Sequence, residues 1–569
     1  MAKLFTPIHR TVAHLIVLFL LLLGMVWARL FHLQIIKQKQ LETRSINNFI
    51  RMNKVDVPRG DIVDTYGNIL ATSRLVMSLY WQGTGKQKFT DEQRHLLHLL
   101  GHYAPIMVQH NVLTNLIHAE RYEKVCRLAK DLTFEQVSRI AERFAHEPNV
   151  LIKNHFKRCY PHNNFASHFV GYLVYQDIES QAKMGIEKLY QEQLKGDPGI
   201  KQYMVNATGK SLTTEEYKSG TAGKTIRTTL DIHLQTIAEE IFPNDMAGCI
   251  IVMDPKTGAL RVLLSRPSFD PSLFLRPLSQ QDWLAMQAKK PFLNRTCNAC
   301  YPPSSLFKLV TMSAALETNI VTTHACRVCH GYYPYRGRKY HCNCREGHGF
   351  VTFEQSLAKS CNIIFFDIGK HICIDTLADY AGRYGLGKPT GIAFAEQHGL
   401  IPSSQWKRTH KGERWWQGET LSAAIGQTYL LATPMQITRM IASISQGFLI
   451  KPRLLEDEPI IKEPLAIKPE TLAFLRRAMH LAAQEGTAQL ICSLPNFTVY
   501  AKTGTAQVVG LKEGQKKSKI PSHAWFVGNV SYKNAPPLTM VVFVEHAGSS
   551  SLPTHIAYQF LRKYAHNLG

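Results

Sequence analysis

The C-terminal half of the sequence predicts an α/β sandwich, and the order of its strand-like and helix-like segments carries that prediction. Two apolar segments, 248–253 and 259–265, flank the turn sequence Asp-Pro-Lys-Thr-Gly and give a strong hairpin signal. Three further strand candidates come only near the end of the chain, at 498–509, 524–530 and 538–545. Between the two groups the apolar residues recur at helical spacing. Strands at both ends of a domain indicate one sheet into which the intervening helices are inserted.

Length and charge limit what this chain can be. The length of 569 residues is enough for roughly two to four domains. Lys and Arg number 66 against 43 Asp and Glu, which gives a net charge of +23. Such an excess suits an anionic partner, namely nucleic acid, a phospholipid surface or an anionic polymer, although it also serves solubility alone. No zinc-finger, helix-turn-helix or ribonucleoprotein motif accompanies the charge, so we expect no nucleic acid partner.

An apolar run near the N-terminus, 12–28, follows the positive residues Lys3 and Arg10. Extended by a few residues, it is long enough to cross a bilayer as a helix. A cleavable signal peptide is the alternative, but Val-Trp-Ala at 26–28 is a poor cleavage site, so we expect an uncleaved anchor. Positive residues before the run place the N-terminus inside. We expect a cytoplasmic tail over 1–11, a single span of the cytoplasmic (inner) membrane over 12–33, and an extracytoplasmic remainder.

Between the span and the sheet domain lies a region without recognisable chemistry. Short strand-like segments joined by a tight turn at 66–68 follow a polar stretch. From about 90 to 147 the apolar spacing is helical. A polar, glycine-containing linker at 217–224 ends the region, and a helix over 231–241 opens the next. We expect a non-catalytic pedestal domain over 34–220 and a catalytic domain over 221–569.

The second domain contains a serine followed three residues later by a lysine, Ser305 and Lys308. Two prolines precede them and helical apolar spacing follows, so Ser305 falls at or just inside a helix N-terminus. Side chains at i and i+3 lie about 5 to 6 Å apart at Cβ, which brings the amine within reach of the hydroxyl. That is the arrangement of a serine nucleophile with a lysine base. The same spacing recurs at Ser356/Lys359 and Ser404/Lys407, so it is weak evidence alone.

Two further short motifs follow in the same domain. Ser360-Cys361-Asn362 lies in a helical context, and Lys502-Thr503-Gly504-Thr505 lies in a late strand candidate, where glycine permits close approach of another backbone. Lys256-Thr257-Gly258 has the same letters, but it falls between two apolar strands and is best explained as turn chemistry. Each tripeptide alone is more often structural than catalytic. The ordered set of three motifs is far more specific.

In that order the three motifs resemble the active-site motifs of the penicillin-recognising serine transpeptidases and β-lactamases. The N-terminal anchor, Arg59-Gly60-Asp61-Ile62 and Gly185-Ile186-Glu187 are similar to class B penicillin-binding proteins over nearly the whole chain. Gly347-His348-Gly349, Gly426-Gln427 and Thr433-Pro434 resemble the elongation type, penicillin-binding protein 2. The resemblance implies an antiparallel sheet with helices on both faces and a helical subdomain, after an elongated mixed α+β pedestal. One departure is Ser304, where the family usually has glycine.

The resemblance also implies the chemistry. Ser305 would attack the carbonyl between the two terminal D-alanines of a peptidoglycan stem peptide, and Lys308 would accept its proton. Lys308 must then be neutral, and burial beside the cation Lys502 would lower its pKa. Ser360 would relay a proton to the leaving amine, and Asn362 would orient Lys308. The substrate-binding residues would be Thr503, Gly504 and Thr505, with the N–H groups of Ser305 and Thr505 as the oxyanion hole.

Seven of the 12 cysteines lie between Cys297 and Cys361, at metal-like spacing. Penicillin-binding protein 2 homologues are similar in carrying a zinc site in this stretch, with two acidic residues, a histidine and a cysteine as ligands. Matching the Gly-His-Gly and Ser-x-Asn motifs places Cys329, Cys342, His348 and Cys361 at these positions, so that two acidic ligands have become cysteines. We expect one structural zinc. The alternative is one or two disulfides, such as Cys326 with Cys344, and Cys297 with Cys300 as a further pair.

Taken together, the resemblance implies a membrane-anchored D,D-transpeptidase that acts in cell-wall elongation and shape and is inhibited by β-lactams. Its expected partners are stem peptides with their lipid-linked precursor, the membrane glycan polymerase of the elongation machinery, and accessory membrane proteins. A division-type class B enzyme is the near alternative. A β-lactam sensor or β-lactamase would share the three motifs but differ in deacylation, and a non-enzymatic scaffold would not be acylated by penicillin at all.

Overall fold

The structure, a computed structural model, describes residues 5–105, 110–175, 180–205, 211–276, 278–507 and 520–568. Its internal contacts divide the chain into two compact units. Unit 1 comprises Met1–Arg59, Ser73–Lys157 and Lys195–Gly223. Unit 2 comprises Gly60–Thr72, Arg158–Leu194 and Lys224–Gly569. The chain therefore passes between the units several times before it stays in unit 2.

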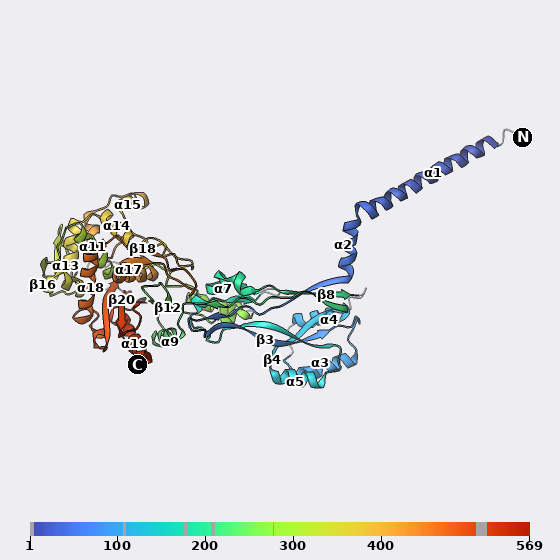
Figure 1. Cartoon of the computed structure of the whole chain (residues 1–569), viewed down its shortest axis with the longest axis horizontal. Coiled ribbons are helices and arrows are strands. Elements are labelled where there is room, and N and C mark those ends of the chain that lie inside the picture. The colour runs from blue at the N-terminus through green and yellow to red at the C-terminus, as the bar shows by residue number, and fades with distance from the viewer. Residues whose placement is uncertain are drawn as a thin grey trace. The chain divides into compact units, whose positions relative to one another are not determined.

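Unit 1 begins with a long apolar helix (dark blue in Figure 1). Helix α1 (Phe5–Phe31) continues through a π-helical turn, η1 (His32–Ile36), into α2 (Gln38–Phe49). Within the described residues, 11–36 is the one helical stretch long and apolar enough to cross a membrane. Its large side chains are exposed, Leu15 by 61% and Trp27 by 67%. Such a surface requires an apolar surrounding, so the predicted apolar N-terminal helix is confirmed.

The rest of unit 1 consists of two small sheets with helices. Strands β1 (Ile50–Val55), β8 (Gly199–Val205) and β9 (Ser211–Lys218) form one antiparallel sheet. In the other, β3 (Ile69–Gln82), which enters unit 1 at Ser73, pairs with β4 (Val125–Leu132) and β5 (Val150–Cys159). Helices α3 (Asp91–Tyr103), α4 (His110–Arg121) and α5 (Phe134–Arg143) complete this part.

The predicted run of helix from 90 to 147 is wrong at β4. The segment Val125–Leu132 is a strand because it pairs with β3, which lies far back in the sequence. Side chains of β3, β4 and the helices bury one another in a core that includes Trp81, Leu100 and Leu128. Pairing with a distant strand therefore outweighs the helical spacing of the apolar residues in this segment.

Unit 2 is built on a five-stranded antiparallel sheet that draws on both ends of the domain. Its order is β12 (Leu260–Arg266), β11 (Gly248–Met253), β21 (Leu538–Val544), β20 (His523–Tyr532) and β19 (Phe497–Ala506). Figure 1 shows the late strands, in orange and red, together with green β12 in one domain. The predicted strands are confirmed, although 508 and 509 lie outside the described residues. Lys256 lies in the turn between β11 and β12, where its N–H donates to Asp254.

Successive side chains of this sheet enter two different cores. Ile250, Val252 and Val542 pack in one cluster with α9 (Ile232–Ile241) and α19 (Ser551–Leu568). Cys249, Ile251 and Val541 belong to the other cluster, with α17 (Pro434–Gln446) and α18 (Pro469–Gln484). Alternation with period two sends neighbouring residues to opposite faces. Helices therefore cover both faces, and the predicted fold class is confirmed.

The chain between β12 and β19 forms the helical part of unit 2 and three small strand pairs. Besides α17 and α18, its helical segments are η2 (Pro271–Leu275), α10 (Gln280–Ala288), η3 (Ser304–Leu306), α11 (Lys308–Glu317), α12 (Phe353–Ala358), α13 (Asn362–His371), α14 (Ile374–Arg383), α15 (Ser404–Lys411), α16 (Gln417–Ala423) and η4 (Gln489–Ser493). The strand pairs are β13 (Cys326–Cys329) with β16 (Gly349–Thr352), β14 (Tyr332–Tyr335) with β15 (Arg338–His341), and β17 (Phe448–Ile450) with β18 (Lys462–Pro464).

Two motifs far apart in the sequence meet at the start of unit 2. The buried Arg158 side chain donates to Glu187 Oε1 at 2.6 Å and to the carbonyl oxygen of Gly60 at 2.8 Å. Asp64 Oδ1 accepts the N–H groups of Tyr66 and Asn68, so the predicted tight turn at 66–68 is confirmed. The remaining short elements here are β2 (Ile62–Val63), α6 (Ser167–Val170), β6 (Leu173–Tyr175), β7 (Ser180–Ala182), α7 (Gly185–Leu189), α8 (Gln191–Lys195) and β10 (Ile226–Arg227).

Candidate active site and metal centre

Ser305 lies in the 3-10 turn η3, directly before α11, as the helical spacing predicted. The preceding residue, Ser304, has a φ of +51°, a left-handed conformation that suits glycine, the residue that the resemblance leads us to expect here. The Ser304 N–H donates to Gly426 O at 2.9 Å, and its hydroxyl donates to Thr505 O at 2.6 Å. The half-buried Ser305 hydroxyl has no hydrogen-bond partner within the described part of the chain. Of the two serines, Ser305 therefore has the free hydroxyl.

Gly426 packs against the turn that carries Ser305. It has a φ of +77°, and a Cβ atom there would lie 1.9 Å from the carbonyl oxygen of Ser304. A larger residue would displace the turn, so the Gly426-Gln427 motif of the sequence has a direct structural reason.

The Lys308 amine contacts the second motif. Lys308 Nζ donates to the carbonyl oxygen of Ser360 at 2.7 Å, to its hydroxyl at 3.2 Å, and to Asn362 Oδ1 at 2.7 Å. The lysine side chain is fully buried. Burial lowers the pKa of Lys308 to about 8, while Cys361 and Cys342 act in the opposite direction. At pH 7 about a tenth of this amine is therefore unprotonated and able to act as a base.

Lys502 approaches the same hydroxyl from the sheet. Lys502 Nζ lies 3.0 Å from Ser360 Oγ and 3.0 Å from Thr503 O. Burial, followed by repulsion from Lys308, lowers the Lys502 pKa well below its ordinary value. A hydroxyl oxygen has two acceptor sites and one proton. With both amines donating to it, the Ser360 hydroxyl can still donate its own proton to a third group.

Ser360 occupies a turn rather than a helix, so the predicted helical context is wrong in detail. The residue lies between α12 and α13 and has a φ of +55°. A hydrogen bond from the Cys361 N–H to Ser356 O, at 2.8 Å, stabilises this turn. This conformation aims the carbonyl and the hydroxyl of Ser360 at the same amine.

The third motif lies on β19, whose far side carries no neighbouring strand among the described residues. Thr505 O accepts the Ser304 hydroxyl, and the N–H of a strand residue points to the same edge as its C=O. The Thr505 N–H therefore points toward the nucleophile turn. A Cβ atom on Gly504 would lie 3.4 Å from Leu306 and from Trp525, so glycine allows this close packing.

Thr487 is a neighbour that the sequence did not reveal. The hydroxyl of Thr503 bonds to that of Thr487 at 2.6 Å. Thr487 lies between α18 and η4 and belongs to no recognisable motif. Only the fold brings it to the strand, so no signal in the sequence could have identified it.

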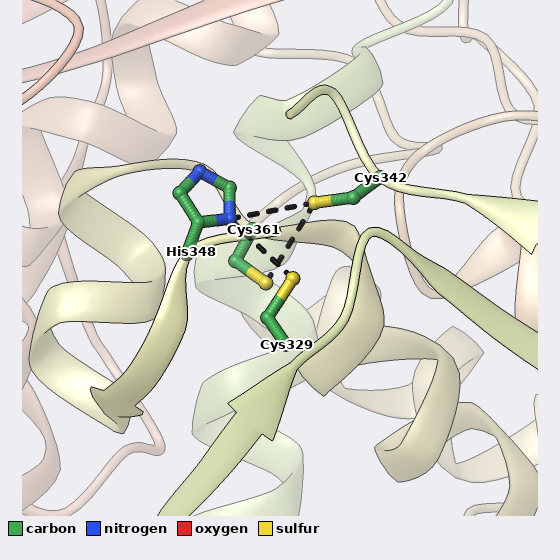
Figure 2. Close-up of side chains that lie close together, drawn as sticks. All are labelled: Cys329, Cys342, His348 and Cys361. Atoms are coloured by element: carbon green, nitrogen blue, oxygen red, sulfur yellow. Dashed lines mark hydrogen bonds between the residues drawn. The ribbon is translucent and has the colours of Figure 1, made fainter. Parts of the chain in front are cut away.

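The four predicted metal ligands lie together, as Figure 2 shows. Their ligand atoms all lie within 4.8 Å of one another. Cys342 Sγ is 3.5 Å from His348 Nδ1 and 3.8 Å from Cys361 Sγ, and Cys329 Sγ is 3.6 Å from His348 Nδ1. In tetrahedral zinc sites, with bonds of about 2.3 Å to sulfur and 2.0 Å to nitrogen, ligand atoms lie about 3.5 to 3.8 Å apart. The Cys3His cluster can therefore hold a metal ion.

Two short strand pairs carry these candidate ligands. Cys329 ends β13, Cys342 follows β15, and His348 precedes β16. Gly347 has a φ of +92°, and a Cβ atom there would lie 2.2 Å from Cys329 O, so this loop crossing requires glycine. Cys361 comes from the catalytic turn between Ser360 and Asn362.

The strand pairs that carry the candidate metal ligands also contact Asn362, a candidate catalytic residue. The Asn362 N–H donates to Cys342 Sγ at 3.4 Å, and Asn362 Nδ2 donates to His341 O at 3.1 Å. Its remaining amide oxygen accepts Lys308. These contacts with Cys342 and His341 therefore orient the Asn362 side chain, which in turn holds Lys308.

Disulfides, the alternative use of these thiols, are not formed. All 12 cysteines are free, including Cys326, Cys344, Cys297 and Cys300. The Cys344 thiol instead donates to Gly347 O at 3.2 Å.

Comparison with known proteins agrees with the three motifs. Residues 248–562 match the penicillin binding protein transpeptidase domain, and residues 54–228 match the penicillin-binding protein dimerisation domain. The peptidoglycan D,D-transpeptidase MrdA of Haemophilus influenzae is 28% identical over 94% of this chain and 88% of its own length.

Two solved structures are similar over most of their length. The first is penicillin-binding protein PBP2 of Helicobacter pylori in complex with MreC, with a TM-score of 0.78 and 26% identity over 92% of this chain and 99% of that chain. The second comes from a peptidoglycan synthase complex that coordinates polymerization and crosslinking, with a TM-score of 0.75 and 28% identity over 97% and 98% of the two chains. The chain thus belongs to the penicillin-binding protein transpeptidase family, as a class B member homologous to the PBP2-type enzymes.

Proposed function

We propose that this chain is a peptidoglycan D,D-transpeptidase of the elongation type, in which Ser305 is the nucleophile and Lys308 its base. The observation that carries the proposal is the sharing of one hydroxyl by two buried amines. Ser360 Oγ lies within hydrogen-bond distance of both Lys308 Nζ and Lys502 Nζ. Two amines held together away from water favour the neutral form, which a proton acceptor requires.

The reaction proceeds in two acyl-transfer steps. Ser305 Oγ adds to the carbonyl carbon between the terminal D-alanines of a stem peptide, and neutral Lys308 takes the hydroxyl proton. The tetrahedral intermediate then breaks its C–N bond, and the departing D-alanine amine receives a proton from Ser360, which Lys308 replenishes. An amine of a second stem peptide attacks the ester, forms the crosslink and releases Ser305.

The backbone around Ser305 supports the charged intermediate. The N–H groups of Ser305 and Thr505 form the oxyanion hole, a role for which the orientation of Thr505 is suitable. The free edge of β19 accepts the extended stem peptide as an added strand. Thr503, Gly504 and Thr505 with Lys502 bind its terminal carboxylate.

Labelling with a fluorescent penicillin tests the nucleophile. A β-lactam places its strained amide where the D-alanyl amide bond would lie, so the wild-type protein becomes covalently labelled. Ser305→Ala removes the label, whereas Ser304→Ala retains it. Labelling that survives in Ser305→Ala would refute the assignment.

The persistence of the label separates the transpeptidase from the alternatives. After free penicillin is removed, a transpeptidase keeps its label over hours, whereas a β-lactamase loses it within seconds to minutes. A non-enzymatic scaffold takes up no label.

We propose further that the Cys3His cluster holds one structural zinc. Three thiolates and one imidazole form a common structural zinc set, and no position is left open for a substrate. Zinc supplies charge compensation and rigidity here, while the protein residues carry the acyl transfer. Elemental analysis of the purified protein should give close to one zinc per chain. Absence of metal together with absence of free thiols would favour disulfides instead.

The N-terminal apolar helix suggests where the enzyme works. We propose that 12–33 spans the cytoplasmic membrane once and that the catalytic unit lies outside, where peptidoglycan is built. The partner proteins are a membrane glycan polymerase and an MreC-like protein, as in the complexes of the similar proteins. Copurification of the protein with such partners from native membranes tests both the partners and the membrane location.

A further inference from the structure

The β14–β15 hairpin exposes aromatic and cationic side chains that the acyl-transfer chemistry does not use. Tyr332 is 42% exposed, and Arg336, Arg338 and Lys339 are all exposed. Arg336 lies over the Tyr335 ring at 5.6 Å, and Lys339 lies over the Tyr332 ring at 4.7 Å. Cations stacked on these rings place positive charge and aromatic groups together at the surface.

A second segment extends this surface. Gly418 lies against the hairpin, since a Cβ atom there would be 3.4 Å from the Tyr340 hydroxyl. Just before it, Arg414 stacks over Trp416 at 3.7 Å, and Trp416 is 45% exposed. We call this set of six residues the hairpin surface: Tyr332, Arg336, Arg338, Lys339, Arg414 and Trp416.

The cations of the hairpin surface have no acidic partners. Among the described residues, none of its four cations forms an ion pair. The nearby acids Glu413 and Glu419 both bind Lys407, and Asp367 binds Arg327. The positive charge therefore stays available to an outside ligand.

One end of the β14–β15 hairpin lies next to the candidate active site. His341, the last residue of β15, accepts the Asn362 side-chain amide at 3.1 Å. From His341 to Arg338 the strand extends about 10 Å at its rise of 3.4 Å per residue. A polymer joined to the molecule being acylated can therefore reach both places at once.

We infer that the hairpin surface binds the glycan strand of uncrosslinked peptidoglycan while its stem peptide is acylated, an inference that rests on the proposed transpeptidase function. Sugar rings present flat C–H faces that pack on Tyr332 and Trp416. Stem peptides carry free carboxylates at every repeat, and these pair with Arg336, Arg338 and Lys339. The surface acts as a positioning site, because it holds the polymer and touches no reacting atom.

Strand binding by the full-length protein tests the inference. The probe is fluorescent, uncrosslinked peptidoglycan strands, compared with the same strands after amidase has removed the stem peptides, with anisotropy as the readout. Arg336→Glu/Arg338→Glu should weaken binding of intact strands roughly tenfold, because two attractive surface charges become repulsive. The effect on strands without stem peptides should be much smaller. Trp416→Ala should weaken both probes severalfold.

Matched variants control for general charge and exposure. Lys256→Glu/Arg562→Glu reverses two exposed cations on other elements, and Phe134→Ala removes an aromatic ring that is 82% exposed. Both should bind strands as the wild type does. Because Trp416 lies outside the hairpin, its variant reports on the surface even if the hairpin variant loses its fold.

Fluorescent penicillin separates this inference from the proposed function. Small β-lactams do not reach the hairpin surface, so the acylation rate of all these variants should stay within about twofold of the wild type. Unchanged strand binding in the hairpin and Trp416 variants would overturn the inference, and so would equally tight binding of a DNA oligonucleotide of the same charge. A wild-type protein that binds strands but takes no penicillin would instead refute the transpeptidase assignment alone.

Discussion

The two halves of the candidate active site are held in very different ways. Lys502 and Thr503 lie on β19, which pairs along its whole length with β20 and is backed by buried side chains such as Trp525 and Val527. Ser360 and Asn362 lie beside two-stranded pairs of four residues per strand. Strand pairs of that size are marginal on their own. A large core fixes the first half, whereas the second half lies beside a Cys3His cluster that can hold a metal ion.

This difference assigns a role to the cysteine-rich insertion. The Asn362 N–H bonds to Cys342 Sγ, and Cys361 is itself part of the catalytic turn. A metal bound there would hold Ser360 and Asn362 in place, as the hydrophobic core holds Lys502 and Thr503. Three cysteines and one histidine are a ligand set typical of structural zinc.

Ser360→Ala should give the largest effect, because Ser360 is where the two halves meet. Its hydroxyl joins Lys308 to Lys502, and without it the leaving amine has no proton donor. Removal of a positioned acid–base group typically costs about 10²- to 10⁴-fold in rate. The second-order rate constant of penicillin acylation, measured by stopped flow, should fall by about that factor. A fall of less than fivefold would exclude the relay.

Removal of the metal should disorder the helical half of the site, which carries Ser360 and Asn362, and leave the sheet half in place. Cys342→Ala, or treatment with a strong zinc chelator, should lower the acylation rate about 10- to 100-fold, as losses around metal ligands do. Val527→Ala, opposite Lys502 in the sheet, should cost about 2 kcal/mol of stability and leave acylation nearly intact. Thermal unfolding and acylation should be measured on the same samples. If Cys342→Ala and Val527→Ala lowered the acylation rate equally, the two halves of the site would not be held in different ways.

The pH dependence of acylation should report the lowered Lys308 pKa. The base must be neutral, so the rate rises with pH and levels off above the Lys308 pKa of about 8. Below that value each pH unit should change the rate about tenfold. Acylation rates between pH 5.5 and 9.5 would check this. A plateau that begins only near pH 10 would show that Lys308 is not perturbed.

Ser304→Gly should have the smallest effect. Glycine relieves the left-handed strain at this position, worth about 1 kcal/mol, but it removes the hydrogen bond to Thr505 O, which is worth about as much. We expect little change in melting temperature and less than a threefold change in acylation rate. A large loss of acylation would mean that the Ser304 hydroxyl takes part in the chemistry.

Much of this molecule could be predicted from its sequence because its signals are local. The strands of the catalytic sheet are short apolar runs, and the four ligands at Cys329, Cys342, His348 and Cys361 follow from matched motifs. Three features depend on tertiary structure and could not be predicted. These are the β4 strand, the left-handed turn at Ser360 and the contact of Thr487 with Thr503. The roles of the candidate catalytic residues and the predicted divisions of the chain into 1–11, 12–33, 34–220 and 221–569 stay predictions.

The most direct test of the account is the site of covalent attachment. Wild-type protein should be acylated with penicillin, digested, and its peptides sequenced by tandem mass spectrometry. We expect a single adduct on Ser305, with Ser304 and Ser360 unmodified. An adduct on either of those two serines would contradict the central claim that Ser305 is the hydroxyl activated by Lys308.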